Sequence, residues 1–429
     1  MSRLVPPAAI VDISRTLERA GHEAWCVGGA VRDALLGIAT LDWDVATSAR
    51  PEEVQRLFKR TVPVGIQFGT VGVLDRDGVL HEVTTFRHDV ETDGRHAVVR
   101  FGASLEEDLA RRDFTVNAIA VHAERLEVRD PFGGRADLEA QVIRCVGEPR
   151  ERMREDRLRA LRAVRFAGRF GFRIDPATWD AIRESAPHLG RLSMERVKQE
   201  LEKVLAQVAR PGATLERYRE AGILDALMPV LAAAPVARFA ALDHLRPTAR
   251  AARAVERVAL RLAACLAEPG APPPRDLERT LKALKFSNAE ARLAVAMARA
   301  LGALAWPLGD WDDVTLRRAV AAVGRLDVPA VARLCWARQT AELEAQGADA
   351  IARTAARRAG VALYRRARRM AWHDPLAIGD LAVDGDDLRT AGITEGRAIG
   401  ETLQRLLDAV LEDPARNTRE SLLALARAS

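Results

Sequence analysis

Residues 26–44 read Cys-Val-Gly-Gly-Ala-Val-Arg-Asp-Ala-Leu-Leu-Gly-Ile-Ala-Thr-Leu-Asp-Trp-Asp, and this stretch decides the fold of the N-terminal part of the chain. The apolar run at 25–27 predicts a short buried strand, and the glycine pair at 28–29 predicts a tight turn. A helix is expected over 30–36, and the tripeptide 42–44 is expected to open a second strand. The pattern indicates a strand–turn–helix–strand unit.

Two features of this stretch indicate phosphate and metal binding. Gly28 and Gly29 allow backbone N–H groups to approach a polyphosphate at the start of a helix, where the dipole favours anions. Asp42 and Asp44 are two apart on the expected strand, so their carboxylates point to one face, where they repel each other unless a cation such as Mg²⁺ lies between them. Each feature alone is typical of an ordinary turn with exposed aspartates. Together they favour metal-assisted phosphoryl or nucleotidyl transfer.

The composition is that of a folded protein of 429 residues, 48% of them hydrophobic, which predicts two to four domains. No apolar signal segment and no uncharged run of about 18 apolar residues is visible, so we expect a cytoplasmic protein with no membrane partner. The four cysteines lack metal-ligand spacing and are expected to be buried thiols. A net charge of +5 permits a nucleic-acid partner without requiring one.

The first third of the chain alternates helical and extended patterns. Residues 20–146 are expected to form an α/β unit with a small mixed sheet, which includes a hairpin turning at 75–78 and a mobile loop at 88–95. We also expect a helix at 105–113 followed by a strand at 114–121. After Gly147 the strands stop, and amphipathic helices in an elongated all-α array are expected.

Shorter elements are expected between these. They are a helix over 9–20, a helix beginning at Pro51 with Ser48 as its cap, a turn cluster over 130–137, a strand over 142–146 and one long helix over 151–170.

Glu82 is a third candidate acid, in the middle of the expected strand after the hairpin turn. From a neighbouring strand it could complete a metal site or help to deprotonate an attacking hydroxyl. A glutamate on the wet face of a strand is an equally good interpretation.

Arg111, Arg112 and Asp113 end the short helix before the expected strand. Adjacent arginines point in different directions, so one can bind a triphosphate bidentately while the other makes a structural pair. Asp113 could accept a hydrogen bond from a ribose hydroxyl. The alternative is a solvated helix C-terminus, which is unfavourable for an aspartate because its negative charge opposes the helix dipole.

The long helix carries Asp156, Arg159, Arg162 and Arg165 at intervals of three, which makes them neighbours on one face. An aspartate beside an arginine presents an acceptor and donors that can match the edge of a nucleobase, and the following arginines suit phosphates. The alternative is an ordinary surface ion pair of little energetic value.

Five short motifs occur in order along this part of the chain. They are Gly28-Gly-Ala-Val-Arg-Asp, Asp42-Trp-Asp, Arg111-Arg-Asp-Phe-Thr-Val-Asn-Ala, Asp130-Pro-Phe-Gly-Gly and Glu155-Asp-x-x-Arg159. Together they resemble the bacterial class II tRNA nucleotidyltransferase and poly(A) polymerase family over about residues 20–205. Residues 381–400 are similar to that family's tail.

The resemblance implies a polymerase-β-like head (1–146), a base-recognising neck (147–205), a helical body (206–305) and a tRNA-binding tail (306–429). It implies that a tRNA 3′-hydroxyl attacks the α-phosphorus of CTP or ATP, with Mg²⁺ as cofactor. A homodimer is left open.

The resemblance also implies a role for each matching residue. Asp42 and Asp44 would hold Mg²⁺, Gly29 and Arg32 the triphosphate, and Arg112 and Asp113 the triphosphate and ribose, while Asp156 and Arg159 would read the base and Arg162 and Arg165 bind the nucleotide.

The chain departs from the family at several points. Trp43 replaces a smaller aromatic residue, and Glu91 stands where family members often have tyrosine, which puts the role of the loop in doubt. The segment 258–270 resembles a degraded HD phosphohydrolase helix, in which Ala267 cannot bind a metal, so no such activity is expected. His244 and His373 are expected to be structural.

The leading hypothesis is an enzyme that builds the CCA end of tRNA. Enzymes adding only CC are expected to lack the flexible loop, whereas this chain keeps residues 87–101, which favours CCA addition or addition of the final A. Poly(A) polymerase is the nearest rival. A small-molecule nucleotidyltransferase with a helical partner-binding scaffold is a different class, and a non-catalytic RNA-binding module is disfavoured by the aspartate pair.

Overall fold

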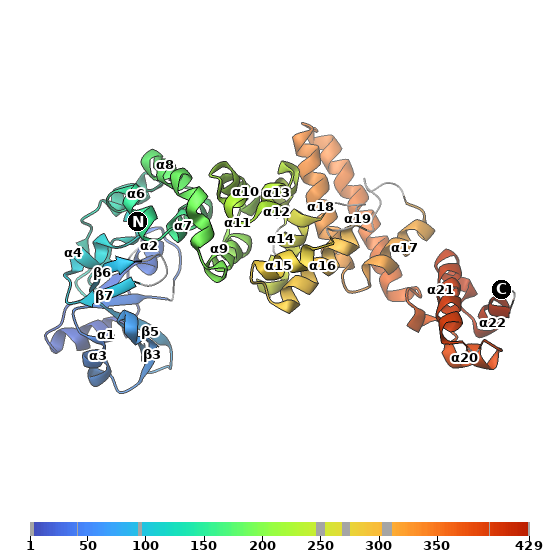
Figure 1. Cartoon of the computed structure of the whole chain (residues 1–429), viewed down its shortest axis with the longest axis horizontal. Helices are drawn as coiled ribbons and strands as arrows, with labels where there is room; N and C mark the ends of the chain where they lie inside the picture. Colours follow the sequence, from blue (N-terminus) through green and yellow to red (C-terminus); the bar gives the residue numbers. More distant parts are fainter. Residues whose placement is uncertain are drawn as a thin grey trace. The chain divides into compact units, whose positions relative to one another are not determined.

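The structure is a computed structural model that describes residues 4–40, 42–92, 97–245, 254–267, 275–302, 311–393 and 395–427. The chain forms two compact units (Figure 1). The first comprises residues 1–209 and 217–232, and the second comprises residues 210–216 and 233–429. No helix in these described ranges is long and apolar enough to cross a membrane.

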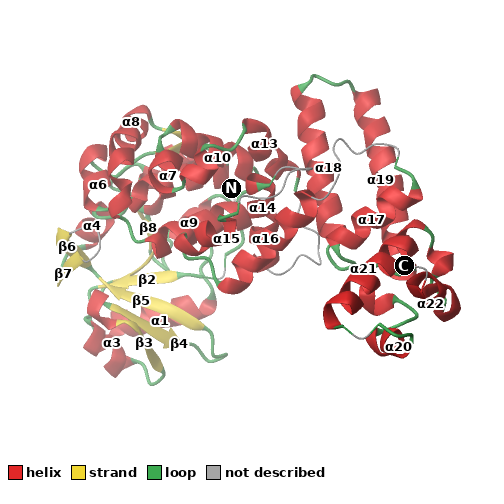
Figure 2. Cartoon of the chain, turned by 45° about the vertical axis from the view of Figure 1, so that its right-hand side comes forward, coloured by secondary structure: helices red, strands yellow, loops and turns green. Residues whose placement is uncertain are grey.

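The first unit contains a seven-stranded sheet in the order β3-β4-β5-β2-β1-β8-β9 (Figure 2). Its strands are β1 (Ala24–Val27), β2 (Asp44–Thr47), β3 (Thr61–Gly65), β4 (Thr70–Leu74), β5 (Leu80–Thr85), β8 (Ala120–Val121) and β9 (Val128–Arg129). Strand β2 runs parallel to β5, and the other neighbouring pairs are antiparallel. The predicted mixed sheet and the β4–β5 hairpin are therefore confirmed.

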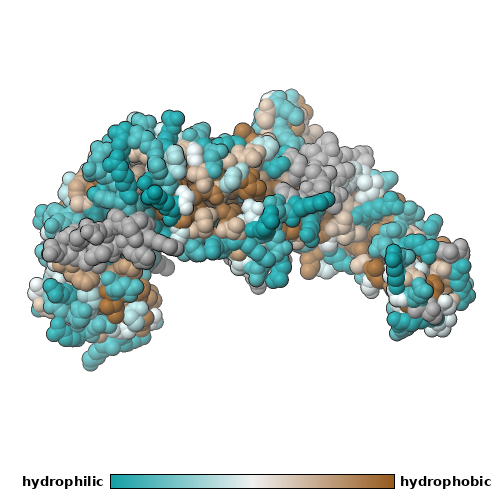
Figure 3. Space-filling view, in the orientation of Figure 1, coloured by the Kyte–Doolittle hydropathy of each residue, from teal (hydrophilic) through white to brown (hydrophobic). Residues whose placement is uncertain are grey.

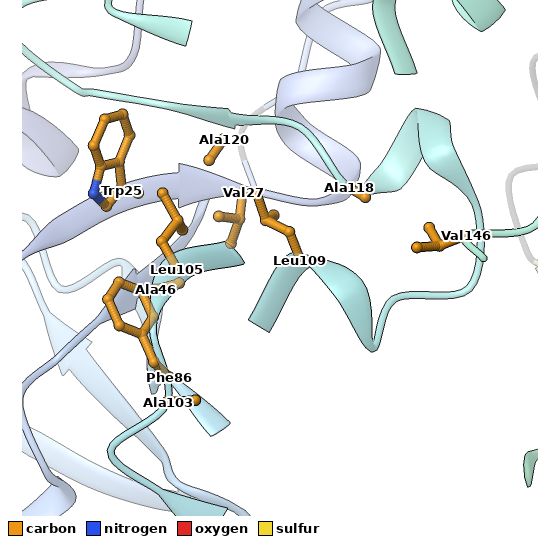
Figure 4. Close-up of a cluster of buried hydrophobic side chains, with 10 residues drawn as sticks. All are labelled: Trp25, Val27, Ala46, Phe86, Ala103, Leu105, Leu109, Ala118, Ala120 and Val146. Carbon is orange, nitrogen blue, oxygen red and sulfur yellow. The ribbon is translucent and has the colours of Figure 1, made fainter. Parts of the chain in front are cut away.

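Five helices belong to the same α/β part. They are α1 (Ala8–Arg19), α2 (Gly29–Leu35), α3 (Pro51–Leu57), α4 (Leu105–Ala110) and α5 (Gly134–Glu139). Apolar side chains of α4 pack on the sheet: Leu105 and Leu109 join Trp25, Val27 and Phe86 in one buried cluster (Figure 4). This cluster fixes α4, and hence the arginines that follow it, against β1.

The predicted loop at 88–95 is wrong for most of its length. The backbone of β6 (Arg87–Thr92) pairs with β7 (Ala97–Phe101) in an antiparallel hairpin, and residues 93–96 lie outside the described residues. The extended run after the polar segment, Ala-Val-Val-Arg-Phe, provides a partner strand that the polar composition concealed.

The predicted strand at 114–121 is short in the structure. Residues Thr115–Asn117 form a 3₁₀ turn, and only Ala120 and Val121 pair in the sheet. The cause is local, because the Asp113 carboxylate accepts hydrogen bonds from the backbone N–H of Phe114 and the side-chain amide of Asn117.

Two helix starts differ from expectation. Ser48 does not cap α3: its hydroxyl accepts from the Glu23 backbone N–H, while the Glu53 carboxylate accepts from the Arg50 N–H at the helix start. The turn cluster at 130–137 contains the beginning of α5, because the Asp130 carboxylate accepts the N–H groups of the first helical residues.

Helices dominate the described residues after Gly147, as predicted, and the exception is strand β11 (Arg173–Ile174). It pairs in parallel with β10 (Val142–Ile143), which lies before Gly147 and is shorter than the predicted strand over 142–146. The helices that complete the first unit are α6 (Pro149–Glu155), α7 (Leu158–Phe170), α8 (Pro176–Ser185), α9 (Met194–Gln207), α11 (Ile223–Leu227) and α12 (Pro229–Ala232), while α10 (Pro211–Glu220) runs through both units.

The second unit is helical throughout its described residues. Its helices are α13 (Val236–His244), α14 (Ala254–Leu266), α15 (Leu277–Ala283), α16 (Asn288–Gly302), α17 (Asp313–Val323), α18 (Val328–Ala345), α19 (Ala350–His373), α20 (Gly385–Thr390), α21 (Gly396–Glu412) and α22 (Arg419–Arg427). Figure 3 shows hydrophilic and apolar residues intermixed over the visible surface. All four cysteines are buried free thiols, as predicted.

Candidate active site

A polar cleft of about 620 Å³ lies in the first unit, where the start of α2 meets α7 and α9. Its lining residues come from segments far apart in the sequence. They are Gly28, Gly29, Arg32, Asp42, Asp44, Arg111, Arg112, Asp113, Asn117, Asp156, Arg159, Arg162, Arg165, Phe166, Arg169, Lys203 and Gln207. Every predicted site residue except Glu82 is among them.

The glycine turn forms one wall of the cleft. Gly28 has φ 76° and ψ −137°, a conformation that residues with a side chain rarely adopt. A Cβ atom added at Gly28 would lie 3.0 Å from Arg112 Nη1. The backbone conformation therefore favours glycine, and a side chain here would also displace the tip of Arg112 by a few tenths of an ångström.

The two aspartates lie where β2 begins. Only Asp44 is in the strand, and Asp42 precedes it, but both side chains line the cleft. Burial and, to a smaller extent, the charges of Asp42 and Glu82 together raise the pKa of Asp44 to about 6, while Arg112 opposes them. Such crowded carboxylates are a suitable donor set for a hard divalent cation.

Glu82 is exposed on β5, opposite Gly72 of β4. Its charge reaches Asp44, yet it does not line the cleft. Among the residues that the structure describes, no three His, Cys, Asp or Glu side chains are arranged to hold a metal ion. A metal or base role for Glu82 stays a prediction.

Arg32 is buried beside the glycine turn and held by two residues that the sequence analysis missed. Its Nε and Nη2 donate to Asp33 Oδ1 at 2.8 and 2.6 Å, and its Nη1 donates to Asn117 Oδ1 at 2.5 Å. Arg169 donates to the other oxygen of Asp33 at 2.9 Å. Asp33 thus joins an arginine of α2 to an arginine of α7.

Arg111 and Arg112 share one buried carboxylate. Arg111 Nη2 lies 2.8 Å from Asp108 Oδ1, and Arg112 Nη2 lies 3.0 Å from Asp108 Oδ2. One structural pair was predicted, and the structure shows two, because Asp108, one turn earlier on α4, is within reach of both arginines. Both arginines still line the cleft.

Asp113 is held by three donors. It accepts from Arg162 Nε at 2.8 Å, from Asn117 Nδ2 at 2.8 Å and from the Phe114 N–H at 2.9 Å. Burial opposes its ionisation, but Arg162 and the Asn117 hydrogen bond hold the pKa of Asp113 below its usual value. The carboxylate is therefore charged in the cleft wall.

Glu200 of α9 is a further residue that the sequence analysis missed. It is 2% exposed and accepts from Arg165 Nε at 2.5 Å and from Lys203 Nζ at 3.1 Å, with Arg162 Nη1 at 3.9 Å. Its sequence signal is its place on the apolar face of α9, next to Leu201. A glutamate at such a position needs a buried cation.

The predicted long helix is broken at the site. Helix α6 ends at Glu155 and α7 begins at Leu158, where the Asp156 carboxylate accepts the Leu158 N–H at 3.0 Å and Arg196 Nη2 at 2.7 Å. No glycine or proline marks this break. The Asp156 side chain itself interrupts the helix, because it accepts the backbone N–H of Leu158 two residues later.

Asp156 and Arg159 are consequently not the side-by-side ion pair that was predicted. Arg159 Nη1 donates to Glu155 Oε2 at 2.6 Å, and its Nη2 donates to the Arg111 carbonyl at 3.0 Å. Both residues nevertheless line the cleft. Arg159 ties α7 to the residue that follows α4.

Comparison with known proteins agrees with this geometry. A model of the poly A polymerase head domain matches residues 24–144, one described as the probable RNA and SrmB-binding site of polymerase A matches 171–234, and one described as a putative tRNA nucleotidyltransferase domain 2 matches 270–426. The fold is thus that of a nucleotidyltransferase.

Relatives match over the full length. The chain is 39% identical to the CCA-adding enzyme of Geobacillus kaustophilus, over 96% of this chain and 95% of that one. The crystal structure of the Bacillus stearothermophilus CCA-adding enzyme in complex with CTP aligns with a TM-score of 0.72 at 33% identity, over 98% and 96% of the two chains.

A Thermotoga maritima CCA-adding enzyme complexed with tRNA shares the fold, with a TM-score of 0.62 at 21% identity over 99% of this chain and 96% of that one. The chain belongs to the CCA-adding enzymes of the tRNA nucleotidyltransferase and poly(A) polymerase family.

Proposed function

We propose that this chain adds C and A nucleotides to the 3′ end of tRNA, using CTP and ATP and no nucleic-acid template. The observation that carries the proposal is the cleft itself, which places Asp42 and Asp44 beside arginines of both the head and the neck. Carboxylates suit a metal ion, and arginines suit a triphosphate.

Asp42 and Asp44 would hold the divalent cation, which we propose to be Mg²⁺. When bound, such an ion neutralises phosphate charge and favours ionisation of a coordinated hydroxyl. Arg32 and Arg112, beside the Gly28 turn, would bind the triphosphate. The charged Asp113 would orient the ribose by accepting from a hydroxyl.

Selection between the bases is assigned to the neck. Asp156 and Arg159 lie at the α6–α7 junction and line the same cleft, although each has other partners in the structure. A nucleobase that replaces the Arg196 contact of Asp156 would gain an acceptor from the protein. Base selection by these two residues remains a proposal.

Several further expectations are proposals of the same kind. They are the head, neck, body and tail boundaries at 146, 205 and 305, a base or metal role for Glu82, tRNA as the partner of the tail, a homodimer and a cytoplasmic location.

An addition assay tests the proposal and its rivals. Purified protein is given tRNA ending at the discriminator base, at C or at CC, each with CTP, ATP or both. The proposal predicts that all three substrates are completed to CCA when both nucleotides are present, and that ATP alone completes only the tRNA ending at CC. Addition of CC only would indicate a CC-adding enzyme, addition of the final A only an A-adding enzyme, and addition of long A tracts a poly(A) polymerase. No addition to any RNA would favour a nucleotidyltransferase that acts on a small molecule.

A further inference from the structure

Two phenylalanines of α7 form an aromatic stack under the arginines of the cleft. The rings of Phe166 and Phe170, one helical turn apart, are stacked at a centroid distance of 6.0 Å and an interplanar angle of 8°. Phe114, which follows Asp113, packs edge-on against Phe166 at 5.9 Å. Phe166 is 5% exposed and lines the cleft, so the stack is a fixed part of its wall.

Four arginines of the cleft lie over these two rings. The guanidinium carbons of Arg165, Arg32 and Arg162 are 4.2, 5.0 and 5.3 Å from the centroid of Phe166. Those of Arg32 and Arg169 are 4.8 and 4.9 Å from the centroid of Phe170. Arg32 comes from α2 and the other three come from α7, so the stack is shared by head and neck.

Such crowding of cations is costly. Burial and the charge of Arg169 lower the pKa of Arg32 against the opposing effect of Asp33. Carboxylates relieve the repulsion, but each one occupies N–H donors, as Asp33 does on Arg32 and Asp113 on Arg162. An aromatic face stabilises a guanidinium without accepting its N–H groups in this way. Donors are thereby left for a ligand.

We propose that Phe166, supported by Phe170, is a positioning residue that holds Arg32, Arg162 and Arg165 at a fixed spacing for the phosphates of the incoming nucleotide. This inference rests on the proposed function. It assigns to the stack a role in binding phosphate common to CTP and ATP, not a role in choosing between their bases.

The test measures binding without tRNA, by titration calorimetry of the full chain with CTP, ATP and inorganic pyrophosphate in the presence of Mg²⁺. Removing the ring face in Phe166→Leu is expected to weaken the binding of all three ligands about tenfold, because the buried guanidinium groups lose their cation–π contacts. Phe166→Tyr, which keeps the face, is expected to restore binding to within about twofold.

Phe172→Leu is the matched control. Phe172 is 4% exposed and lies next to Phe170 at 5.6 Å, but no arginine lies over its ring in the described part of the chain. Its substitution should lower the melting temperature and leave the three dissociation constants within about twofold of wild type.

Three results would overturn the proposal: unchanged binding in Phe166→Leu, equal weakening in Phe172→Leu, or weaker CTP and ATP with unchanged pyrophosphate. If circular dichroism shows that Phe166→Leu does not fold, Phe166→Met carries the same expectation. Failure of the wild-type protein to extend tRNA would reject the proposed function, whereas these dissociation constants judge the aromatic stack separately.

Discussion

A single buried carboxylate, Glu200, pairs with cationic side chains of both α7 and α9. It contacts Arg165, Lys203 and, more distantly, Arg162, and all three line the cleft. Removing the carboxylate of such a buried group leaves the positive charges of its partners uncompensated in a medium of low dielectric constant.

We therefore expect Glu200→Gln to lower the free energy of unfolding by about 3 kcal/mol, measured by urea denaturation. Glu202→Gln on the same helix is the control, because its pair with Lys198 is partly exposed and should cost about 0.5 kcal/mol or less. Equal losses of unfolding free energy in the two variants would show that Glu200 contributes no more than an ordinary surface carboxylate.

Asp44 is expected to oppose folding when it is charged. In the metal-free protein its pKa is about 6, above the ordinary value of 3.8, so between these values the folded state retains a proton that the unfolded state has lost. The contribution of Asp44 to stability therefore falls as the pH rises through this window.

Asp44→Asn removes this effect together with the carboxylate that we propose to hold the metal ion. With EDTA present, its melting temperature should match that of wild type near about pH 4 and exceed it near about pH 7.5. A variant that is less stable than wild type at neutral pH would contradict the raised pKa. Asp12→Asn, at an exposed site of α1, is the control and should show no such crossover.

At the residue scale, the sequence indicates the residues that line the cleft better than the residues that support them. Asp42 and Asp44 could be predicted because two carboxylates close behind a glycine pair have a local chemical meaning, and Arg32 because its motif resembles that of the family. Asn117 and Glu200 could not, because each acts on an arginine that is distant along the chain and adjacent only in the fold.

The Gly28 turn is the element on which the cleft depends. A side chain at position 28 would adopt a strained backbone conformation and press on Arg112 Nη1 at 3.0 Å. Gly28→Ala is therefore expected to lose about 2 kcal/mol of stability and to weaken CTP binding.

Gly29→Ala is the matched control for stability. Position 29 is helical, and the nearest atom to a new Cβ, Arg32 Nη2, is at an ordinary 3.5 Å. Its free energy of unfolding should stay within about 0.5 kcal/mol of wild type. Comparable losses from both alanines, measured by urea denaturation, would show that the backbone at Gly28 is not special.

Elements with regular periodicity could be predicted, and those shaped by local side-chain capping could not. Helix α1 and the β4–β5 hairpin follow from apolar spacing and an acidic turn. The helix break at Asp156 and the 3₁₀ turn after Asp113 arise because each aspartate accepts a nearby backbone N–H. These hydrogen bonds outweigh the helix propensity of the first segment and the strand propensity of the second.

At the scale of the whole molecule, the second unit contains an unusually cationic helix. Helix α19 has seven arginines and no acidic residue, and Arg366 pairs with Asp313. Arg357 and Arg358 are exposed near its middle. We expect such a helix to contact RNA phosphates if the tail binds tRNA as proposed.

Replacing Arg357 and Arg358 together by serine should weaken tRNA binding and reduce the slope of log K against log salt by about one for each phosphate that is no longer neutralised. CTP affinity should not change. Arg279→Ser, at an exposed arginine paired with Asp276, is the control. An unaltered salt slope in the double variant, measured by filter binding, would remove α19 from the RNA surface.

The helical character of the chain beyond Gly147 could be predicted from amphipathic periodicity. Its division into two compact units could not, because residues 210–216 belong to the second unit and 217–232 return to the first. The return of residues 217–232 to the first unit depends on contacts between residues far apart in the sequence. One of them is the hydrogen bond from the buried Tyr218 hydroxyl to the Leu161 carbonyl at 2.8 Å.

The most direct test of the central claim is incorporation of labelled CTP and ATP into tRNA lacking its CCA end, by wild type and by Asp42→Ala and Asp44→Ala. Because the two carboxylates are assigned to the metal and not to the RNA, both variants should lose incorporation while binding tRNA with nearly unchanged affinity. Retained incorporation in both variants would contradict the assignment of the cleft as the catalytic site.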